Sequence, residues 1–239
     1  MNRTQVVILA AGLGTRLGSP LPKSLTQLDD GRTILAQQLG NIRDVFGDDA
    51  QVLIVVGFKQ DLVMEAAPDA VFVYNENFDQ TNTSKSLLKA LRQTGDGPTF
   101  WMNGDVVFHP DVLRRVAEAA RTGRSAIAVN TADTAEEEVK YLVNDAGLVT
   151  ALSKQVRDAA GESVGVNVVA QQHKAALIEQ LDRCDDQDYF ERGIELAIDA
   201  SGIEVVPVDI TDLFAVEVDF AEDLERAISV RRAHGGPTA

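Results

Sequence analysis

The feature that most constrains the fold of this chain is a regular alternation of short apolar runs with segments of helical period. Nearly continuous apolar runs are typical of strands buried on both faces of a parallel sheet. We expect such strands at Gln5–Ala10, Val52–Val56, Ala70–Tyr74, Thr99–Met102 and Ser125–Asn130. The spacing of apolar residues predicts helices between them, over Thr33–Val45, Gln60–Ala67, Ser84–Gln93 and Asp111–Ala120. Repeated strand–helix units predict a doubly wound, mostly parallel α/β sheet.

The alternation changes after about residue 136. We expect three further strands close together, at Val139–Asn144, Gly147–Leu152 and Val164–Ala170, of which the first two are joined by a tight turn. The remaining elements are helices over Gln171–Leu181, Tyr189–Ala200 and Phe220–Arg232 and a strand at Val205–Val208. The sequence therefore predicts one domain over residues 1–239: a Rossmann-like sheet with a small antiparallel insertion, a closing helix at 219–232 and a tail at 233–239.

Composition excludes several classes of protein. The 239 residues carry 22 Lys and Arg against 37 Asp and Glu, and this net charge of −15 is opposite in sign to that of a typical duplex-binding protein. No apolar run reaches the ~18 residues that a membrane span needs, and the N-terminus shows no signal-peptide cleavage pattern. The single cysteine excludes an internal disulfide framework and a cysteine zinc site. We expect a cytoplasmic protein without a nucleic acid or membrane partner.

The most informative segment follows the first expected strand and reads LAAGLGTRLGSPLPK over residues 9–23. Glycines at this point let the backbone approach a ligand and direct its N–H groups towards an anion. A dinucleotide-binding loop requires a third glycine where this chain has Leu17, and a P-loop requires a glycine where Pro22 precedes Lys23. The remaining interpretation is a phosphate-binding loop with two cations, Arg16 and Lys23, suited to a reaction that builds negative charge on a triphosphate.

The sequence LAAGLGTRL followed by PK resembles the signature of nucleotidyltransferases that make nucleotide-diphospho sugars and alcohols. The resemblance is strongest to small enzymes similar to sugar-1-phosphate nucleotidyltransferases, phosphocholine cytidylyltransferases and inositol-1-phosphate cytidylyltransferases. It implies transfer of a nucleotidyl group, CMP from CTP first and UTP, GTP or ATP as alternatives, to a small phosphorylated alcohol, cyclitol, sugar or phosphonate with release of pyrophosphate. It also implies nucleotide contacts from Leu9, Ala10, Ala11, Gly12, Gly14, Thr15, Asn82, Ser86 and Asn103.

Two aspartates resemble the family's Mg²⁺ ligands. Asp105 stands in a Gly-Asp pair after an apolar strand, and Asp219 stands in EVDFAEDLE over residues 217–225. Each has a simpler alternative: Asp105 as a turn or cap residue, and Asp219 as the N-cap of the last helix with Glu222 completing a capping box. We expect both to sit beyond the carboxyl ends of strands, where α/β sheets bind their ligands.

The resemblance implies an acceptor site in the second half of the chain. Lys154, in the sequence LSK, and Lys140 correspond to lysines that hold the acceptor phosphate, although a lysine on an amphipathic strand is ordinarily a solvated residue. Glu162 and Glu191 correspond to acids that contact an acceptor hydroxyl or amine. Recognition of a quaternary ammonium favours an aromatic cage, and aromatic residues are few here. We therefore expect a hydroxylated or amino-alkyl acceptor in preference to choline phosphate.

Together these features predict a Mg²⁺-dependent nucleotidyltransferase in which residues 1–130 bind the nucleotide and residues 131–218 the acceptor. Arg16, Lys23 and Lys154 would be the catalytic cations. The alternative is a non-catalytic nucleotide-sensing or partner-binding domain of the same fold, although retention of Arg16, Lys23, Asp105 and Asp219 together argues against it. The sequence does not name the acceptor, and it allows a homo-oligomer without indicating one.

Overall fold

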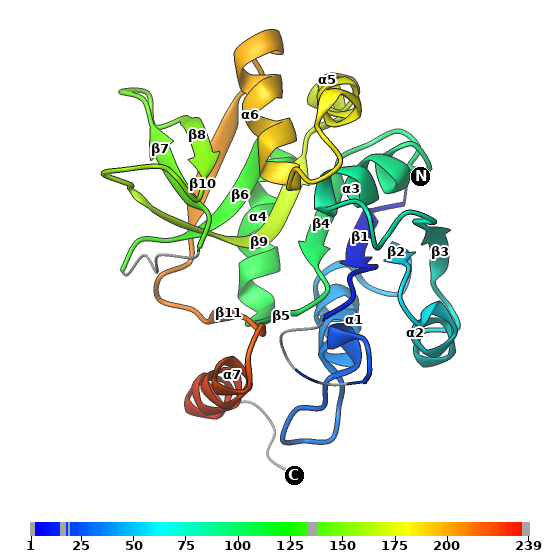
Figure 1. The fold of residues 1–239 in the computed structure, drawn as a ribbon. Coiled ribbons are helices and arrows are strands. Elements are labelled where there is room, and N and C mark those ends of the chain that lie inside the picture. Colours follow the sequence, from blue (N-terminus) through cyan, green and yellow to red (C-terminus); the bar gives the residue numbers. More distant parts are fainter. Residues whose placement is uncertain (1–2, 15–17, 19, 133–137, 236–239) are drawn as a thin grey trace.

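The structure is a computed structural model that describes residues 3–14, 18, 20–132 and 138–235. Its core is a mostly parallel central sheet with the strand order β10-β6-β9-β4-β1-β2-β3 (Figure 1). The strands are β1 (Gln5–Ala10), β2 (Gln51–Val56), β3 (Val71–Tyr74), β4 (Thr99–Asn103), β6 (Ser125–Asn130), β9 (Gly161–Val169) and β10 (Val205–Asp209). β1 is parallel to both β2 and β4, so the expected doubly wound α/β sheet is confirmed.

β9 is the one strand of the central row that runs antiparallel to its neighbours, β4 and β6. We expected this segment in the antiparallel insertion, but it lies inside the central sheet. Val166 and Val168 face one side of the sheet and Val169 the other, and all three are buried. A strand that is apolar on both faces is stable only where helices cover both faces.

The insertion itself is the hairpin of β7 (Lys140–Val143) and β8 (Val149–Ser153), which pairs with the start of β9. A second antiparallel element was not predicted: β5 (Val106–Phe108) pairs with β11 (Ala215–Glu217). Three-residue strands carry too short a pattern to be recognised by periodicity. Their pairing brings segments more than a hundred residues apart in the sequence to the same edge of the molecule.

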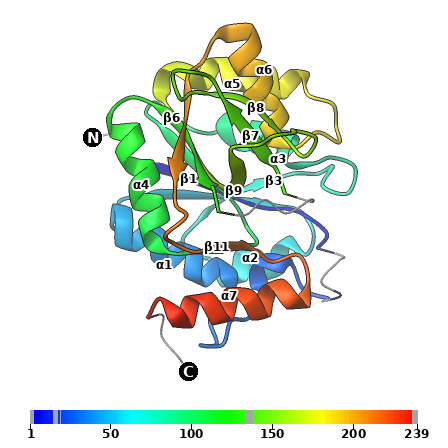
Figure 2. The same ribbon diagram turned by 90° about the vertical axis from the view of Figure 1, so that its left-hand side faces the viewer.

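Helices cover both faces of the sheet, as Figure 2 shows. One face packs against α3 (Thr83–Leu91), α5 (Gln171–Arg183) and α6 (Phe190–Ser201), and the other against α1 (Ile34–Phe46), α2 (Gln60–Ala66) and α4 (Pro110–Arg121). The closing helix α7 (Ala221–Ala233) packs through a separate apolar cluster that includes Leu28, Ile34 and Ala227. In the part of the chain that the structure describes, none of the helices combines the length and the hydropathy of a membrane-spanning segment.

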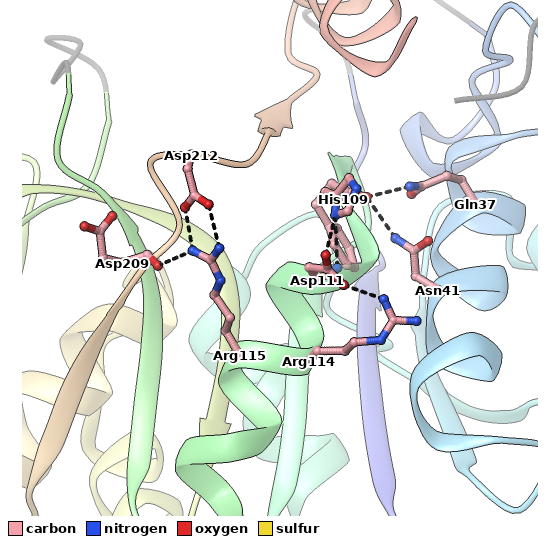
Figure 3. A network of polar contacts seen from close by, with 9 residues as sticks. Gln37, Asn41, His109, Asp111, Arg114, Arg115, Asp209 and Asp212 are labelled. Atoms are coloured by element: carbon pink, nitrogen blue, oxygen red, sulfur yellow. Dashed lines mark hydrogen bonds and ion pairs between the residues drawn. The ribbon is translucent and has the colours of Figure 1, made fainter. Parts of the chain in front are cut away.

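Polar side chains fix the helices to the ends of the strands (Figure 3). Gln37 and Asn41 of α1 donate to the Phe108 carbonyl at 2.7 and 2.9 Å. On α4, Arg115 forms a two-point ion pair with Asp212, both distances being 2.6 Å. These contacts hold the loops that follow β5 and β10 against the helices.

Candidate active site

A cavity of about 520 Å³ opens where β1 and β4 end. This is the carboxyl edge of the parallel strands, the usual ligand site of such sheets. Its lining includes six of the residues that we expected to contact a nucleotide: Leu9, Ala10, Gly12, Gly14, Asn82 and Asn103. The cavity therefore brings the glycine loop, the start of α3 and the end of β4 to one place.

The glycine loop passes close to Lys23. Gly14 has a φ of +62°, in the left-handed region that favours glycine, and a Cβ there would lie 2.9 Å from Lys23 Cγ. Ala11 lies outside the lining found for the described residues, and its carbonyl accepts from the Phe58 amide at 3.1 Å. Thr15 and Arg16 fall outside the described residues, so their expected roles stay predictions.

The start of α3 contributes one of its two expected residues to the cavity. Asn82 is the helix N-cap and accepts from the Thr83 amide at 2.8 Å. Ser86 lies one turn deeper and is 5% exposed. Its hydroxyl accepts from Asn75 Nδ2 at 3.1 Å, behind the part of the wall that the structure describes. Ser86 is therefore not among the described residues that line the cavity, and its expected contact with the nucleotide stays a prediction.

An acidic cluster, made of Asp105, Glu217 and Asp219, stands at the end of β4 and β11. A carboxylate oxygen of each residue lies within 4.8 Å of the others. The pairing of β5 with β11 explains this convergence, because Glu217 is opposite Val106 and the Val218 amide donates to the Asp105 carbonyl at 3.0 Å. Asp105 and Asp219 each lie two residues past the end of a strand, β4 and β11 respectively, as we expected.

Asp219 is not the N-cap of α7. Phe220 holds that position, and the Asp223 carboxylate, rather than that of Glu222, accepts from the amides of Asp219 and Phe220 at 3.1 and 2.9 Å. The carboxylate of Asp219 therefore has no capping role and is directed to the acidic cluster.

Lys23 lies within the acidic cluster. Its ammonium group bonds to Asp105 at 3.1 Å and to Asp219. Burial lowers the pKa of Lys23, but Asp105 and Asp219 outweigh it, so the pKa is raised overall. Lys23 is therefore a charged ammonium that partly neutralises the cluster.

The carboxylates repel one another at this spacing. Burial raises the pKa of Asp105, although Lys23 opposes the rise. Burial, with repulsion from Asp105, Glu138 and Asp219, raises the pKa of Glu217 well above its usual value. Oxygen ligands of this kind are what Mg²⁺ prefers, and a divalent cation would offset the repulsion. The donor set therefore fits Mg²⁺.

Sequence reasoning missed Glu217 and Glu138, which both line the cavity. The signal for Glu217 was its place two residues before Asp219, since residues two apart point to the same side of an extended chain. Glu138 follows a segment outside the described residues and had no recognisable pattern. Burial raises its pKa as well, against the effect of Lys154.

The acceptor residues divide into two groups. Glu191, in the first turn of α6, lines the cavity and is 6% exposed, and its Oε2 has no hydrogen-bond partner among the described residues. Burial raises its pKa to about 7. Lys154 also lines the cavity, with its ammonium group 5.3 Å from the centre of the Tyr189 ring. These two residues are placed to meet a ligand.

Lys140 and Glu162 are not brought to the described cavity. They are opposite each other on β7 and β9. Their neighbours Tyr141 and Ser163 face the core and the cavity respectively. Because successive side chains of a strand alternate between its faces, Lys140 and Glu162 lie on the face opposite to Tyr141 and Ser163, and their expected contacts with the acceptor stay predictions.

The sequence is similar to those of known nucleotide-transferring proteins. Residues 6–184 match the MobA-like NTP transferase domain. The CMP-5'-(3-aminopropyl)phosphonate synthase of Streptomyces rubellomurinus is 32% identical over 244 residues, covering 93% of this chain and 38% of that protein. The bifunctional protein GlmU of Burkholderia lata is 31% identical, covering 84% of this chain and 46% of GlmU. The chain therefore spans less than half the length of these relatives.

Solved structures show the same fold. The inositol-1-phosphate CTP transferase of T. maritima superposes with a TM-score of 0.78 at 18% identity, over 97% of both chains. The CTP:phosphocholine cytidylyltransferase LicC of Streptococcus pneumoniae superposes with a TM-score of 0.72 at 18% identity, over 95% of this chain and 99% of LicC.

Proposed function

The chain belongs to the family of MobA-like NTP transferase domains, and from this premise we propose that it transfers CMP from CTP to a small phosphorylated or phosphonate acceptor. Pyrophosphate is the second product. The observation that carries the proposal is the Lys23 ammonium held between Asp105 and Asp219 at a cavity that also contains the glycine loop. A cation and a metal site beside a phosphate-binding loop suit the charge changes of phosphoryl chemistry.

The reaction needs alignment more than it needs a base. The second pKa of a phosphate monoester is near 6, so the attacking oxygen is ionised at neutral pH. That oxygen forms a bond to the α-phosphorus, and the bond from the α-phosphorus to the bridging oxygen breaks as pyrophosphate leaves with the electron pair. Lys23 stabilises the charge on the leaving group, and Arg16 shares this role from the glycine loop. Lys154 orients the acceptor oxygen.

Mg²⁺, when bound, neutralises phosphate charge and holds the phosphate oxygens in place. Asp105, Asp219 and Glu217 would hold it. Their separation in the sequence is overcome by the β5–β11 pairing.

The preference for CTP is supported by the edge of the cavity near α3. Asn82, Ala10 and Gly12 line it, and their amide and carbonyl groups would supply the donors and acceptors that read a pyrimidine. The Streptomyces relative is named for a CMP product. UTP, GTP and ATP are the alternatives that the assay below separates.

The acceptor is an amino-alkyl phosphonate or a hydroxylated phosphate. Lys154 suits its anionic end, and the unpartnered oxygen of Glu191 suits a hydroxyl or a primary amine at the other. A quaternary ammonium favours a cage of free aromatic faces. Here the exposed ring in the lining, that of Tyr189, already lies against Lys154. Choline phosphate is therefore disfavoured.

The test is release of pyrophosphate from each of the four NTPs with a panel of acceptors: aminopropylphosphonate, inositol 1-phosphate, a hexose 1-phosphate and choline phosphate. We expect turnover with CTP and an amino or hydroxylated acceptor, and none in the Asp105→Asn variant. Nucleotide binding without pyrophosphate release from any pair would favour a sensing domain of the same fold. Selective use of choline phosphate would refute the acceptor assignment.

A further inference from the structure

A partly buried network of ion pairs connects α7 to the loop of residues 26–33. Arg231, which is 3% exposed, bonds to Asp29 and, at 2.7 Å, to Asp30. Arg232 adds a bond to Asp29 at 2.6 Å, and Arg32 adds one to Asp30 at 2.8 Å. The views in Figures 1 and 2 both place the blue loop beside α7.

The aspartates of this network are ionised despite their surroundings. Burial opposes ionisation of Asp30, but hydrogen bonds from Arg231 and Arg32 lower its pKa to about 2. Apolar packing already attaches α7 through Ala227 and Leu28. Buried ion pairs gain little stability over apolar contacts, and their best-attested use is to fix one arrangement of the elements that they join. We therefore expect the network to fix the position of the loop relative to α7 more than to stabilise the fold.

The two segments joined by the network are those that carry Lys23 and Asp219. The loop follows the short 3-10 helix η2 (Lys23–Leu25) directly, and the Lys23 carbonyl accepts from the Thr26 amide at 2.9 Å. On the other side, Asp219 precedes α7 by two residues and is bound to its first turn through Asp223. Arg231 lies about 15 Å along the helix from Ala221. Each partner of the Lys23–Asp219 ion pair is thus anchored to one side of the network.

We propose that Arg231, with Asp29 and Asp30, is a positioning residue that fixes Lys23 relative to Asp219 and so sets the geometry of the metal and leaving-group site. This inference rests on the proposed function. The loop with η2 and the segment of Asp219 with α7 are thus joined at two places, by the Arg231 network and by the Lys23–Asp219 ion pair. A shift of the loop against α7 would therefore move Lys23 away from the acidic cluster. Displacements of about 1 Å in such a site can cost about 10²-fold in rate.

The main test variant combines Arg231→Met with Asp29→Asn and Asp30→Asn. Removing the arginine alone would leave Asp29 and Asp30 paired only with the more exposed Arg232 and Arg32. The combined change removes all three buried charges and retains their volumes. Arg231→Lys keeps one cation without the two-pronged geometry. The matched control is Arg115→Met with Asp212→Asn, which removes another two-point ion pair (Figure 3). Neither residue is among those found to line the cavity. Circular dichroism checks that each variant is folded.

Two readouts separate positioning from simple support: kcat against KM for CTP, and the affinity of the nucleotide-free protein for Mn²⁺ by electron paramagnetic resonance. We expect kcat of the triple variant to fall about 10- to 100-fold with KM within a few-fold, and Mn²⁺ to bind more tightly because the Lys23 ammonium no longer holds Asp105 and Asp219. We expect intermediate values for Arg231→Lys and an unchanged control. Wild-type kcat and Mn²⁺ affinity in the folded triple variant would overturn the inference. If that variant does not fold, unchanged values in Arg231→Lys overturn it.

The failure of the proposed function gives a different result. A wild-type protein that binds Mn²⁺ but releases no pyrophosphate contradicts the proposed reaction, and the Mn²⁺ affinity of the variants still decides the positioning role. A wild-type protein that binds no Mn²⁺ contradicts both.

Discussion

Replacing Lys23 by methionine should strengthen metal binding and abolish most of the turnover. In the nucleotide-free protein the Lys23 ammonium occupies the space between Asp105 and Asp219, two of the three carboxylates that suit Mg²⁺. A metal ion that binds there must displace the ammonium. Methionine fills a similar volume and carries no charge, so the competition disappears.

The structure gives the size of the effect. Lys23 is 17% exposed at its side chain, so solvent screens its contacts only in part. Displacing it forfeits at least one charge-assisted hydrogen bond, about 1.5–3 kcal/mol, and about 1.4 kcal/mol is a factor of ten in affinity. We therefore expect the variant to bind Mg²⁺ about 10- to 100-fold more tightly. Loss of one electrostatic contact to the leaving group should lower kcat roughly 10²- to 10³-fold.

The assay is calorimetric titration of the nucleotide-free protein with Mg²⁺ at pH 8, where the raised pKa values of the acidic cluster matter least, followed by single-turnover kinetics. Lys89→Met is the matched control, because Lys89 forms its ion pair with exposed Glu76 at 2.9 Å. Unchanged or weaker Mg²⁺ binding in Lys23→Met would refute the competition. Wild-type turnover in the same variant would remove Lys23 from the chemistry.

Three further predictions concern the site and its support. Asp105→Asn and Asp219→Asn should each nearly abolish pyrophosphate release, with the double variant little worse than either single one, because the two act as one unit; additive losses would separate their roles. Because burial raises the pKa of Glu191 from its ordinary 4.5 to about 7, the free energy of unfolding falls by about 3 kcal/mol as pH rises from the lower to the higher of these values. Glu191→Gln should therefore resist urea better than wild type at pH 8, with the difference shrinking towards pH 5. Gly104→Ala places a Cβ 2.8 Å from the Leu9 carbonyl and should cost about 1–3 kcal/mol in urea unfolding, so an unchanged midpoint would contradict the packing.

The glycine-rich loop and the buried strands could be predicted from the sequence because each depends on residues that are neighbours along the chain. A loop of residues 9–23 carries its backbone requirements in its own composition, and β1, β2 and β4 show their burial in unbroken apolar stretches. Asp105 and Asp219 were recognised by resemblance, and each follows a strand. Glu217 was visible in the same motif but had no assigned role.

The sequence by itself determined the class of fold and the family, because strand and helix periods and the glycine loop depend on neighbouring residues. Only the tertiary structure decided which polar residues share the cavity. Ser86 is absent from the described lining because its hydroxyl is bonded to Asn75 one helical turn deeper. Lys140 and Glu162 are absent from it because strand alternation places them on the face opposite to Tyr141 and Ser163. The acidic cluster needed the β5–β11 pairing, which joins strands more than a hundred residues apart. Such contacts depend on the energy of the whole packed chain, and no local pattern records them.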